Sequence, residues 1–283
     1  MGRKSIGIQM SFIEDIAGCI SGKDVTVIRH EGHMMLECGN GATIIPIPIT
    51  ARSPEEAAQA HAGLERSMLS YKADNPERKL VPLPEDVWRS RPDMMKARLL
   101  AQLGEFRSIF ARNTSVRRIT KPESAGFLNE WHTYGDAAAR YRYGIFTKDG
   151  ALIAVATFSS GRKWLKDDRT IRSYEWVRYA SLPEIRVIGG MGKVLKTFIR
   201  EVKPDDIMSY ADMEWTDGQV YTRLGFHEDG FRSPVAFCID PETWRRKPLD
   251  KNIDPNGDFL FHLNLGSRKF RIAGPQLYGT DNE

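Results

Sequence analysis

Cysteine is scarce in this sequence. The chain of 283 residues has three cysteines, Cys19, Cys38 and Cys238, which lie far apart and form no Cys-x-x-Cys pair. An odd number without such spacing argues against a disulfide framework and against a cysteine-based zinc site. His30 and His33 lie in a predicted turn without acidic or cysteine partners at suitable offsets. We therefore expect no metal and a reducing compartment.

Long apolar runs are also absent. No segment is apolar over the length that spans a bilayer, and the first residues, MGRKSIGIQM, lack the continuous apolar core of a signal peptide. These absences predict a cytoplasmic protein without a membrane association. The hydrophobic fraction of 41% and the charged fraction of 28% are those of an ordinary globular protein, with room for one large or two ordinary domains.

The first part of the chain predicts a small α+β domain over residues 1–75. Three short apolar runs between residues 24 and 49 are separated by turn-forming clusters, which is typical of an antiparallel meander. Pro46 and Pro48 alternate in the third run, so this run is either an edge strand or a strand that ends in an extended exit. Ser53 is placed to cap a helix that continues to about Tyr71.

Residues 76–115 are expected to form a linker and a basic amphipathic helix. Prolines at positions 76, 82 and 84 indicate a connector, and apolar residues at helical spacing follow between residues 94 and 103. The basic segment 89–121 can meet the phosphates of nucleic acid or of a cofactor. It is equally consistent with a solvated helix face and a linker. Its basic residues are Arg89, Arg91, Lys96, Arg98, Arg107, Arg112, Arg117, Arg118 and Lys121, and they face only Asp93 and Glu105.

Residues 116–245 alternate between helical and strand patterns, which predicts a mixed α/β (α+β) domain. A helix is expected over 122–132, and two strands, 141–147 and 151–159, are joined by KDG, a hairpin signal. Further strands are expected at 173–180, 207–212 and 235–240, with helices over 193–202 and 219–225. Residues 246–283 are expected to be a C-terminal extension with one strand in FLFHLNL.

A glycine cluster lies between a predicted strand and a predicted helix, in RVIGGMGK. A glycine-rich turn at a helix N-terminus directs free backbone N–H groups at one point and can bind phosphate, with Lys193 or Lys196 adding charge. Glycine before a helix is also common for structural reasons alone. The motif is neither a Walker loop, since Gly-Lys-Ser/Thr is missing, nor a full dinucleotide fingerprint.

The order of motifs after this turn carries a family resemblance. A strand ends in Asp212, and a short helix carrying Tyr221 leads to Leu224-Gly225-Phe226. This order resembles the GNAT superfamily of acyltransferases, which implies a mixed, mostly antiparallel sheet flanked by helices and a cleft for acetyl-CoA or another acyl-CoA. Gly190 and Gly192 match the two small positions of the family's pyrophosphate loop, while Val187 stands where Gln or Arg is usual. The resemblance implies a cofactor-binding loop of Val187, Ile188, Gly189, Gly190, Met191, Gly192 and Lys193.

A closer resemblance is to GNAT-like domains of phage proteins, including those fused to some homing endonucleases and, more distantly, Mom-type DNA-modification proteins. It rests on FLNEWHTYG, YGIFTKDGALIAVATF, YEWVRYA, VIGGMGKVLKTFI and IMSYADMEWTDGQVYTRLGF, within residues 108–240. Residues 1–85 lie outside it and contain no nuclease constellation such as a spaced Asp followed by Glu-x-Lys.

Three residues are candidates for catalysis, and the resemblance implies the role of the first. Tyr221 is implied as the general acid that protonates the leaving thiolate. Asp212 and Glu175, at or near the ends of predicted strands, are candidates for the base, directly or through water. Each has a structural alternative: the Tyr221 ring packs on the sheet, and either carboxylate caps a helix or pairs with Arg178.

Two further residues are candidates for substrate binding. Strand alternation places Arg178 on the same face as Tyr174 and Trp176, where it either holds an anionic group or stacks on Trp176. His132, beside Trp131, either contacts an acceptor or is a packing residue.

Two functions of different classes follow from these residues. The first is an acyl-CoA-dependent N-acyltransferase acting on an amine linked to nucleic acid, with DNA or another nucleic acid bound through the basic segment 89–121. The second is a catalytically inactive GNAT scaffold that binds nucleic acid or serves as an accessory protein. A protein or small-molecule amine is a further alternative for the acceptor.

Overall fold

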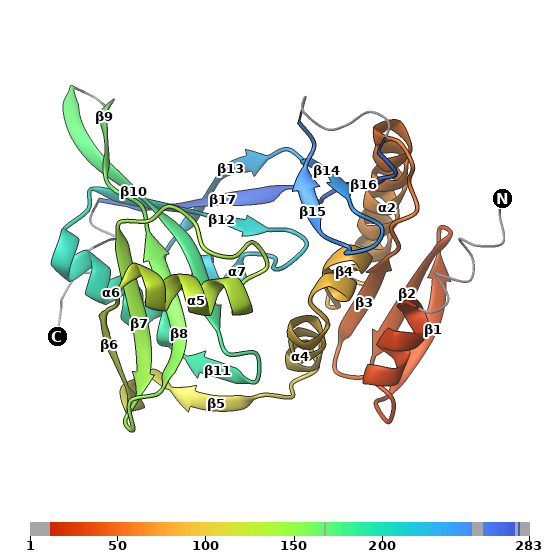
Figure 1. The fold of residues 1–283 in the computed structure, drawn as a ribbon, viewed down its shortest axis with the longest axis horizontal. Coiled ribbons are helices and arrows are strands. Elements are labelled where there is room, and N and C mark those ends of the chain that lie inside the picture. Colours follow the sequence, from red (N-terminus) through yellow and green to blue (C-terminus); the bar gives the residue numbers. More distant parts are fainter. Residues whose placement is uncertain (1–11, 167, 251–256, 275–276, 278–283) are drawn as a thin grey trace. The chain divides into compact units, whose positions relative to one another are not determined.

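The computed structural model describes residues 12–166, 168–250, 257–274 and 277 (Figure 1). The chain divides into two compact units, each assembled from three segments. Unit 1 comprises Met1–Glu105, Asp212–Asp217 and Arg232–Ser267, and unit 2 comprises Phe106–Ala211, Gly218–Phe231 and Arg268–Glu283. The division therefore differs from the expected boundaries at residues 75, 115 and 245.

The first sheet of unit 1 has the order β1-β2-β3-β4, and its strands are β1 (Val25–His30), β2 (His33–Cys38), β3 (Ala42–Ile47) and β4 (Lys79–Pro84). The first three strands form the expected antiparallel meander. The edge-strand alternative for β3 is wrong, because β4 pairs with it in parallel and places Pro46 opposite Leu83.

Strand β4 lies where the sequence predicts a connector. Pro82 and Pro84 are two residues apart, so the N–H groups that they lack would point to the same side of the strand. Strand β4 is the last strand of this sheet in the described part of the chain. Proline is tolerated in such an edge strand.

The helices of unit 1 are α2 (Pro54–Asp74), α3 (Glu85–Ser90) and α4 (Pro92–Gln102), and residues 12–19 are also helical. As expected, the Ser53 side chain caps α2 by accepting a hydrogen bond from the Glu56 N–H. Met94, Met95 and Leu99 bury the apolar face of α4. Strands β15 (Arg246–Pro248), β14 (Ala236–Ile239) and β16 (Leu260–Leu263) form a second sheet in that order.

The main sheet of unit 2 is mixed and mostly antiparallel, as expected. Its order is β13-β17-β12-β10-β8-β7-β6, and β9 pairs with β10 (Figure 1). These strands are β6 (Thr114–Arg118), β7 (Tyr141–Thr147), β8 (Leu152–Phe158), β9 (Arg162–Lys166), β10 (Arg169–Ser181), β12 (Asp206–Asp212), β13 (His227–Arg232) and β17 (Ser267–Ala273). Strand β17 lies between β13 and β12, so the expected C-terminal extension supplies a strand to this sheet.

Two helices cover opposite faces of this sheet. Along β8, Ala154, Ala156 and Phe158 join the core cluster that contains residues of α6 (Gly190–Val202), whereas Val155 joins a cluster with residues of α5 (Lys121–Trp131). Successive strand residues point to opposite faces, so α5 and α6 lie on different sides. Unit 2 also contains the paired strands β5 (Arg107–Phe110) and β11 (Ile185–Ile188), the 3-10 turn η1 (Ala111–Asn113) and α7 (Gln219–Arg223).

No helix in the described part of the chain is both long and apolar enough to cross a membrane.

Candidate functional site

The parallel strands β10 and β12 are paired along only part of their length. Their ladder runs from Ser173↔Asp206 to Trp176↔Ser209. Strand β12 continues to Asp212, while β10 continues to Ser181 in antiparallel pairing with β8. A register shift in that pairing lies between Trp176 and Arg178. The two central strands of the sheet therefore cease to pair at the bulge in β10.

The bulge reverses the alternation of side chains along β10. Val177 is the extra residue, because Trp176 is opposite Phe158 and Arg178 is opposite Thr157. Trp176 belongs to the core cluster on the α6 face, while Arg178 donates from Nε to the Gly135 carbonyl, 3.2 Å away. The expectation that Arg178 shares a face with Trp176 is wrong, because one inserted residue inverts a period of two.

Tyr221 lies in α7 and packs beside the last pair of the ladder. Its ring stacks on Phe270 at 5.2 Å between centroids and meets Trp176 edge-on at 6.2 Å. Its hydroxyl lies 2.8 Å from Ser209 Oγ, and Ser209 Oγ lies 3.0 Å from the Trp176 carbonyl. Ser209 can donate its one proton either to the Tyr221 hydroxyl or to the Trp176 carbonyl.

This environment keeps Tyr221 protonated. Burial raises the pKa of the Tyr221 hydroxyl, and the hydrogen bond with Ser209 opposes that change only in part. The Tyr221 hydroxyl is therefore neutral and carries its proton at neutral pH. Both hypotheses for Tyr221 agree with these contacts: its hydroxyl carries a proton, as a general acid must, and its ring packs in the core.

The predicted glycine turn connects β11 to α6. Gly189 is the N-cap in the left-handed conformation, with φ of 77°, and no side chain caps the helix. Gly190 has no room for a side chain, because an added Cβ would lie 2.7 Å from Val187 Cγ1 and 3.1 Å from the Tyr179 hydroxyl. The first N–H groups of a helix have no partner within the helix. Glycine here brings the backbone of the helix start close to β10 and β11.

The other predicted loop residues differ in their surroundings. Val187 is buried in the core of unit 2, whereas Ile188 is exposed and Met191 packs against the core cluster. Lys193 donates from Nζ to the Ala111 carbonyl at 2.8 Å and to the Thr114 carbonyl. Its charge therefore holds the turn η1 in this structure. Arg186, one residue before Val187, lies over the Phe106 ring at 4.1 Å.

Three other predicted site residues lie on β10 and at the end of α5: Glu175, Arg178 and His132. Burial lowers the pKa of Arg178, and Glu175, Tyr134 and Asp136 raise it in that order. The side chain of His132 accepts from the Tyr134 N–H at 3.1 Å through Nδ1. The structure thus brings Glu175 and Arg178 together, beside the loop that follows α5.

Asp212 belongs to unit 1, at the point where the chain leaves β12. Its Oδ1 accepts from the Glu214 N–H at 2.9 Å. It also raises the pKa of Arg98, whose burial lowers that pKa to about 10. Asp212 therefore stabilises the turn 212–217 through its hydrogen bond to Glu214, and its charge favours the protonated form of Arg98 in α4.

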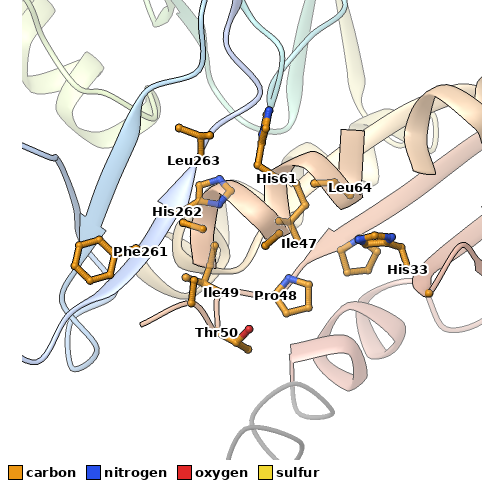
Figure 2. A pocket seen from close by; sticks show the side chains of 15 residues that line it. His33, Ile47, Pro48, Ile49, Thr50, His61, Leu64, Phe261, His262 and Leu263 are labelled. Carbon is orange, nitrogen blue, oxygen red and sulfur yellow. The ribbon is translucent and has the colours of Figure 1, made fainter. Parts of the chain in front are cut away.

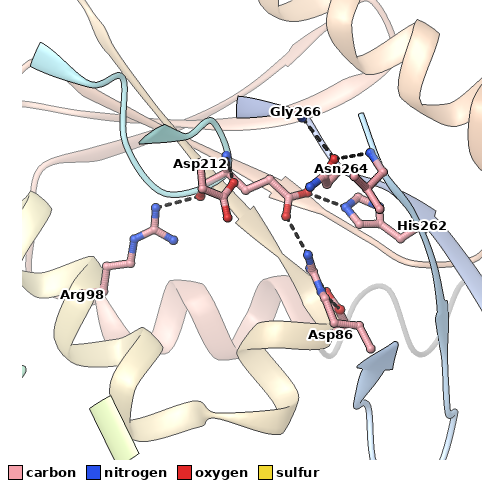
Figure 3. A network of polar contacts seen from close by, with 9 residues as sticks. Asp86, Arg98, Asp212, His262, Asn264 and Gly266 are labelled. Carbon is pink, nitrogen blue, oxygen red and sulfur yellow. Dashed lines mark hydrogen bonds and ion pairs between the residues drawn. The ribbon is translucent and has the colours of Figure 1, made fainter. Parts of the chain in front are cut away.

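Unit 1 contains a buried network of charges that the sequence did not predict (Figure 3). Arg246 forms two hydrogen bonds with Asp86, at 2.6 and 2.7 Å, and one with Glu214 at 2.8 Å. His262 Nε2 lies 2.5 Å from the other Glu214 oxygen. Burial raises the pKa of Glu214, but Arg246 and His262 outweigh it and hold that pKa at about 2. Glu214 is therefore an acceptor only, and His262 Nε2 carries the proton.

A pocket of about 240 Å³ lies beside this network, between β3, α2 and β16 (Figure 2). Its walls include His33, His61 and His262 together with the proline-containing segment 46–51. His61 Nδ1 is buried and has no hydrogen-bond partner among the described residues. None of the site residues predicted from the sequence lines this pocket. Within the described ranges, no group of three or more His, Cys, Asp or Glu residues could hold a metal.

Sequence reasoning missed Ser209 and Tyr179. Ser209 ends the ladder and binds both Trp176 and Tyr221, and Tyr179 places its hydroxyl beside Gly190. The available signal for Ser209 was a hydroxyl in the middle of a predicted strand. The role of Tyr179 could not be predicted, because the bulge in β10 decides to which face of the sheet its side chain points.

Comparison with known proteins gives distant similarities. No protein-family model matches the chain, and no curated protein matches it significantly. Spermidine/spermine N-acetyltransferase SpeG from Vibrio cholerae, solved with manganese ions, has 12% identity and a TM-score of 0.37 over 61% of this chain and 99% of its own. A protein described as histone acetyltransferase HPA2 and related acetyltransferase, from Corynebacterium glutamicum, has 13% identity and a TM-score of 0.36 over 56% and 95%. Similarity at this level does not establish a family, so the proposed function rests on the residues themselves.

Proposed function

We propose that unit 2 is an N-acyltransferase of GNAT type that transfers an acyl group from acyl-CoA to an amine. The observation that carries this proposal is the end of the ladder between β10 and β12 at Trp176 and Ser209. Strand edges that stop pairing can hydrogen-bond an extended, amide-containing ligand, as in β-strand addition. The pantetheine arm of CoA has this chemistry.

The start of α6 is suited to the anionic part of the same substrate. Strand β11, Gly189 and the helix follow one another without a side-chain cap, so the amides of Gly190, Met191 and Gly192 are available for phosphate. The helix of 13 residues adds its dipole. Tyr179 links the two features, because it belongs to β10 beyond the bulge and its hydroxyl lies beside Gly190.

The reaction requires few groups. A neutral amine attacks the thioester carbonyl, a C–N bond forms, the C–S bond breaks and the thiolate takes a proton. Tyr221 is the proposed acid, because its hydroxyl is protonated at neutral pH and Ser209 fixes its position. Glu175 is the proposed base, because its carboxylate is partly exposed and could take a proton from the amine. Arg178, beside Glu175, favours an acceptor with an anionic group, and we propose an amine linked to nucleic acid.

A second candidate function is an inactive scaffold of the same fold. Two observations favour it: Lys193 already binds two backbone carbonyls, and the Tyr221 hydroxyl is already hydrogen-bonded to Ser209. An active enzyme would have to turn the Tyr221 hydroxyl toward the sulfur during the reaction. The two candidates differ in whether acyl-CoA binds and whether it is consumed.

Titration with acetyl-CoA, followed by calorimetry and thermal stability, tests the proposal first. We expect binding and stabilisation, and no binding at millimolar concentration would rule out the enzyme. Release of free CoA in the presence of amines then measures turnover. Tyr221→Phe should keep its affinity and lose about 100-fold or more in rate. Tyr71→Phe is the matched control, since that tyrosine is also buried and hydrogen-bonded but lies in unit 1.

A further inference from the structure

Strand β9 and the start of β10 form a two-stranded arm. Five antiparallel pairs join Arg162–Lys166 to Arg169–Ser173. The pairs of β10 with β12 begin only at Ser173, and those with β8 only at Trp176. The hairpin therefore extends beyond the sheet of unit 2, as Figure 1 shows at the strand labelled β9.

The arm has an excess of positive charge. Residues 162–172 contain five basic and two acidic residues. Lys163 lies directly opposite Arg172, and like charges in this position destabilise a hairpin. Asp205 partly balances Arg172 at 4.0 Å, whereas Arg162, Lys163 and Arg169 are exposed and have no ion pair within the described ranges. A repulsive, unbalanced arrangement of this kind indicates a polyanionic partner.

The arm also exposes large apolar side chains. Trp164 is 55% exposed and Leu165 is 76% exposed. Because neighbouring residues of a strand point to opposite faces, Trp164 lies on one side with Arg162, and Leu165 lies on the other with Lys163. Each face of the ribbon thus presents an apolar side chain next to a cation.

We propose that this arm binds duplex nucleic acid by lying in a groove. The major groove of DNA admits a two-stranded β-ribbon, and phosphates line both of its walls. Cations on both faces of the arm match two walls of phosphate. A membrane is a weaker match, because Trp164 and Leu165 point in opposite directions and cannot enter a bilayer together. The proposal does not depend on acyl transfer, so an inactive scaffold would bind in the same way.

The test uses the full chain and fluorescence anisotropy with a labelled DNA duplex of mixed sequence over a range of salt concentrations. The double charge reversal Lys163→Glu, Arg169→Glu should weaken binding by about tenfold or more and lower the salt dependence, because counterion release scales with the number of phosphates contacted. Trp164→Ala should weaken binding and leave the salt dependence unchanged. The matched control, Lys148→Glu with Arg200→Glu, makes the same change of net charge at exposed positions elsewhere in unit 2.

Several outcomes would overturn the proposal. One is an arm variant that binds duplex as well as the unaltered protein; another is a control variant that loses as much. Loss confined to Arg112→Glu with Arg117→Glu would place binding in the basic segment 89–121 instead. Binding to phosphatidylserine vesicles but not to duplex would identify a membrane partner, and preference for an unpaired strand would exclude the groove. If the reversal variant does not fold, the neutral pair Lys163→Gln, Arg169→Gln gives the same test with a smaller expected loss.

Discussion

The buried charge network of unit 1 allows a quantitative prediction for Glu214→Gln. Glu214 is 5% exposed and binds Arg246 and His262, while Arg246 also binds Asp86. The substitution keeps the shape of the side chain but removes the negative charge that binds Arg246 and His262. Breaking a buried pair by removing one partner typically costs about 3–5 kcal/mol, because the other charge remains buried.

The lowered pKa of Glu214, which has the same contacts as its cause, corresponds to a magnitude of the same order. Its value falls from 4.5 to about 2 in the folded protein. That difference corresponds to about 3 kcal/mol of stability at neutral pH, since one pKa unit is worth about 1.4 kcal/mol. Because the folded pKa is the lower one, this stability is present above the unfolded pKa and is lost as the pH falls toward the folded pKa. About 1 kcal/mol should remain at about pH 3.

Urea unfolding of both proteins at neutral pH and in acid measures these quantities. We expect the glutamine variant to lose about 3 kcal/mol at neutral pH, and the difference between the two proteins to shrink in acid. Glu242→Gln, at an exposed position in unit 1, should be indistinguishable from the unaltered protein. A difference for Glu214→Gln that is below about 0.5 kcal/mol, or that stays constant with pH, would refute this account of the network.

Three further predictions concern the backbone. Gly218→Ala should destabilise unit 2 by more than about 1 kcal/mol, because its φ is 80° and a Cβ would lie 2.4 Å from the Phe270 ring; Gly230→Ala, also at positive φ but with open space around it, should cost less in the same urea assay. Ser53→Ala should cost about 1 kcal/mol through loss of the α2 cap, and an unchanged melting temperature would contradict the cap. Gly190→Ala should weaken acetyl-CoA binding by about tenfold or more while circular dichroism stays the same, and unaltered binding would exclude this loop from the site.

Local structure followed from the sequence wherever neighbouring residues determine it. The KDG turn, with Gly150 at φ of 87°, joins β7 and β8 as predicted, and Ser53 begins α2. The segment after β12 also behaves as its pattern indicates. Tyr221 lies in a short helix that ends at Arg223, two residues before Gly225, and Phe226 packs against the Tyr221 ring. These features depend on dihedral preferences and on contacts within a few residues.

The predicted site is only partly assembled as the pattern suggested. The glycines of the turn do begin α6, and Tyr221 does lie beside the end of the β10–β12 ladder. The direction of Arg178 could not be predicted, because a single inserted residue in β10 inverts every side chain beyond it.

Tertiary structure alone decided the remaining features. The proline-rich segment 79–84 forms a strand because it pairs with β3. Residues 232–267 belong to unit 1, although the chain then returns to unit 2 in β17. The charges of Asp86, Glu214 and Arg246 became buried because residues far apart in the sequence neutralise one another. Sequence determined local conformation, whose energies come from adjacent residues. Burial, pairing and charge balance between distant residues depend on which segments meet, and only the folded chain shows that.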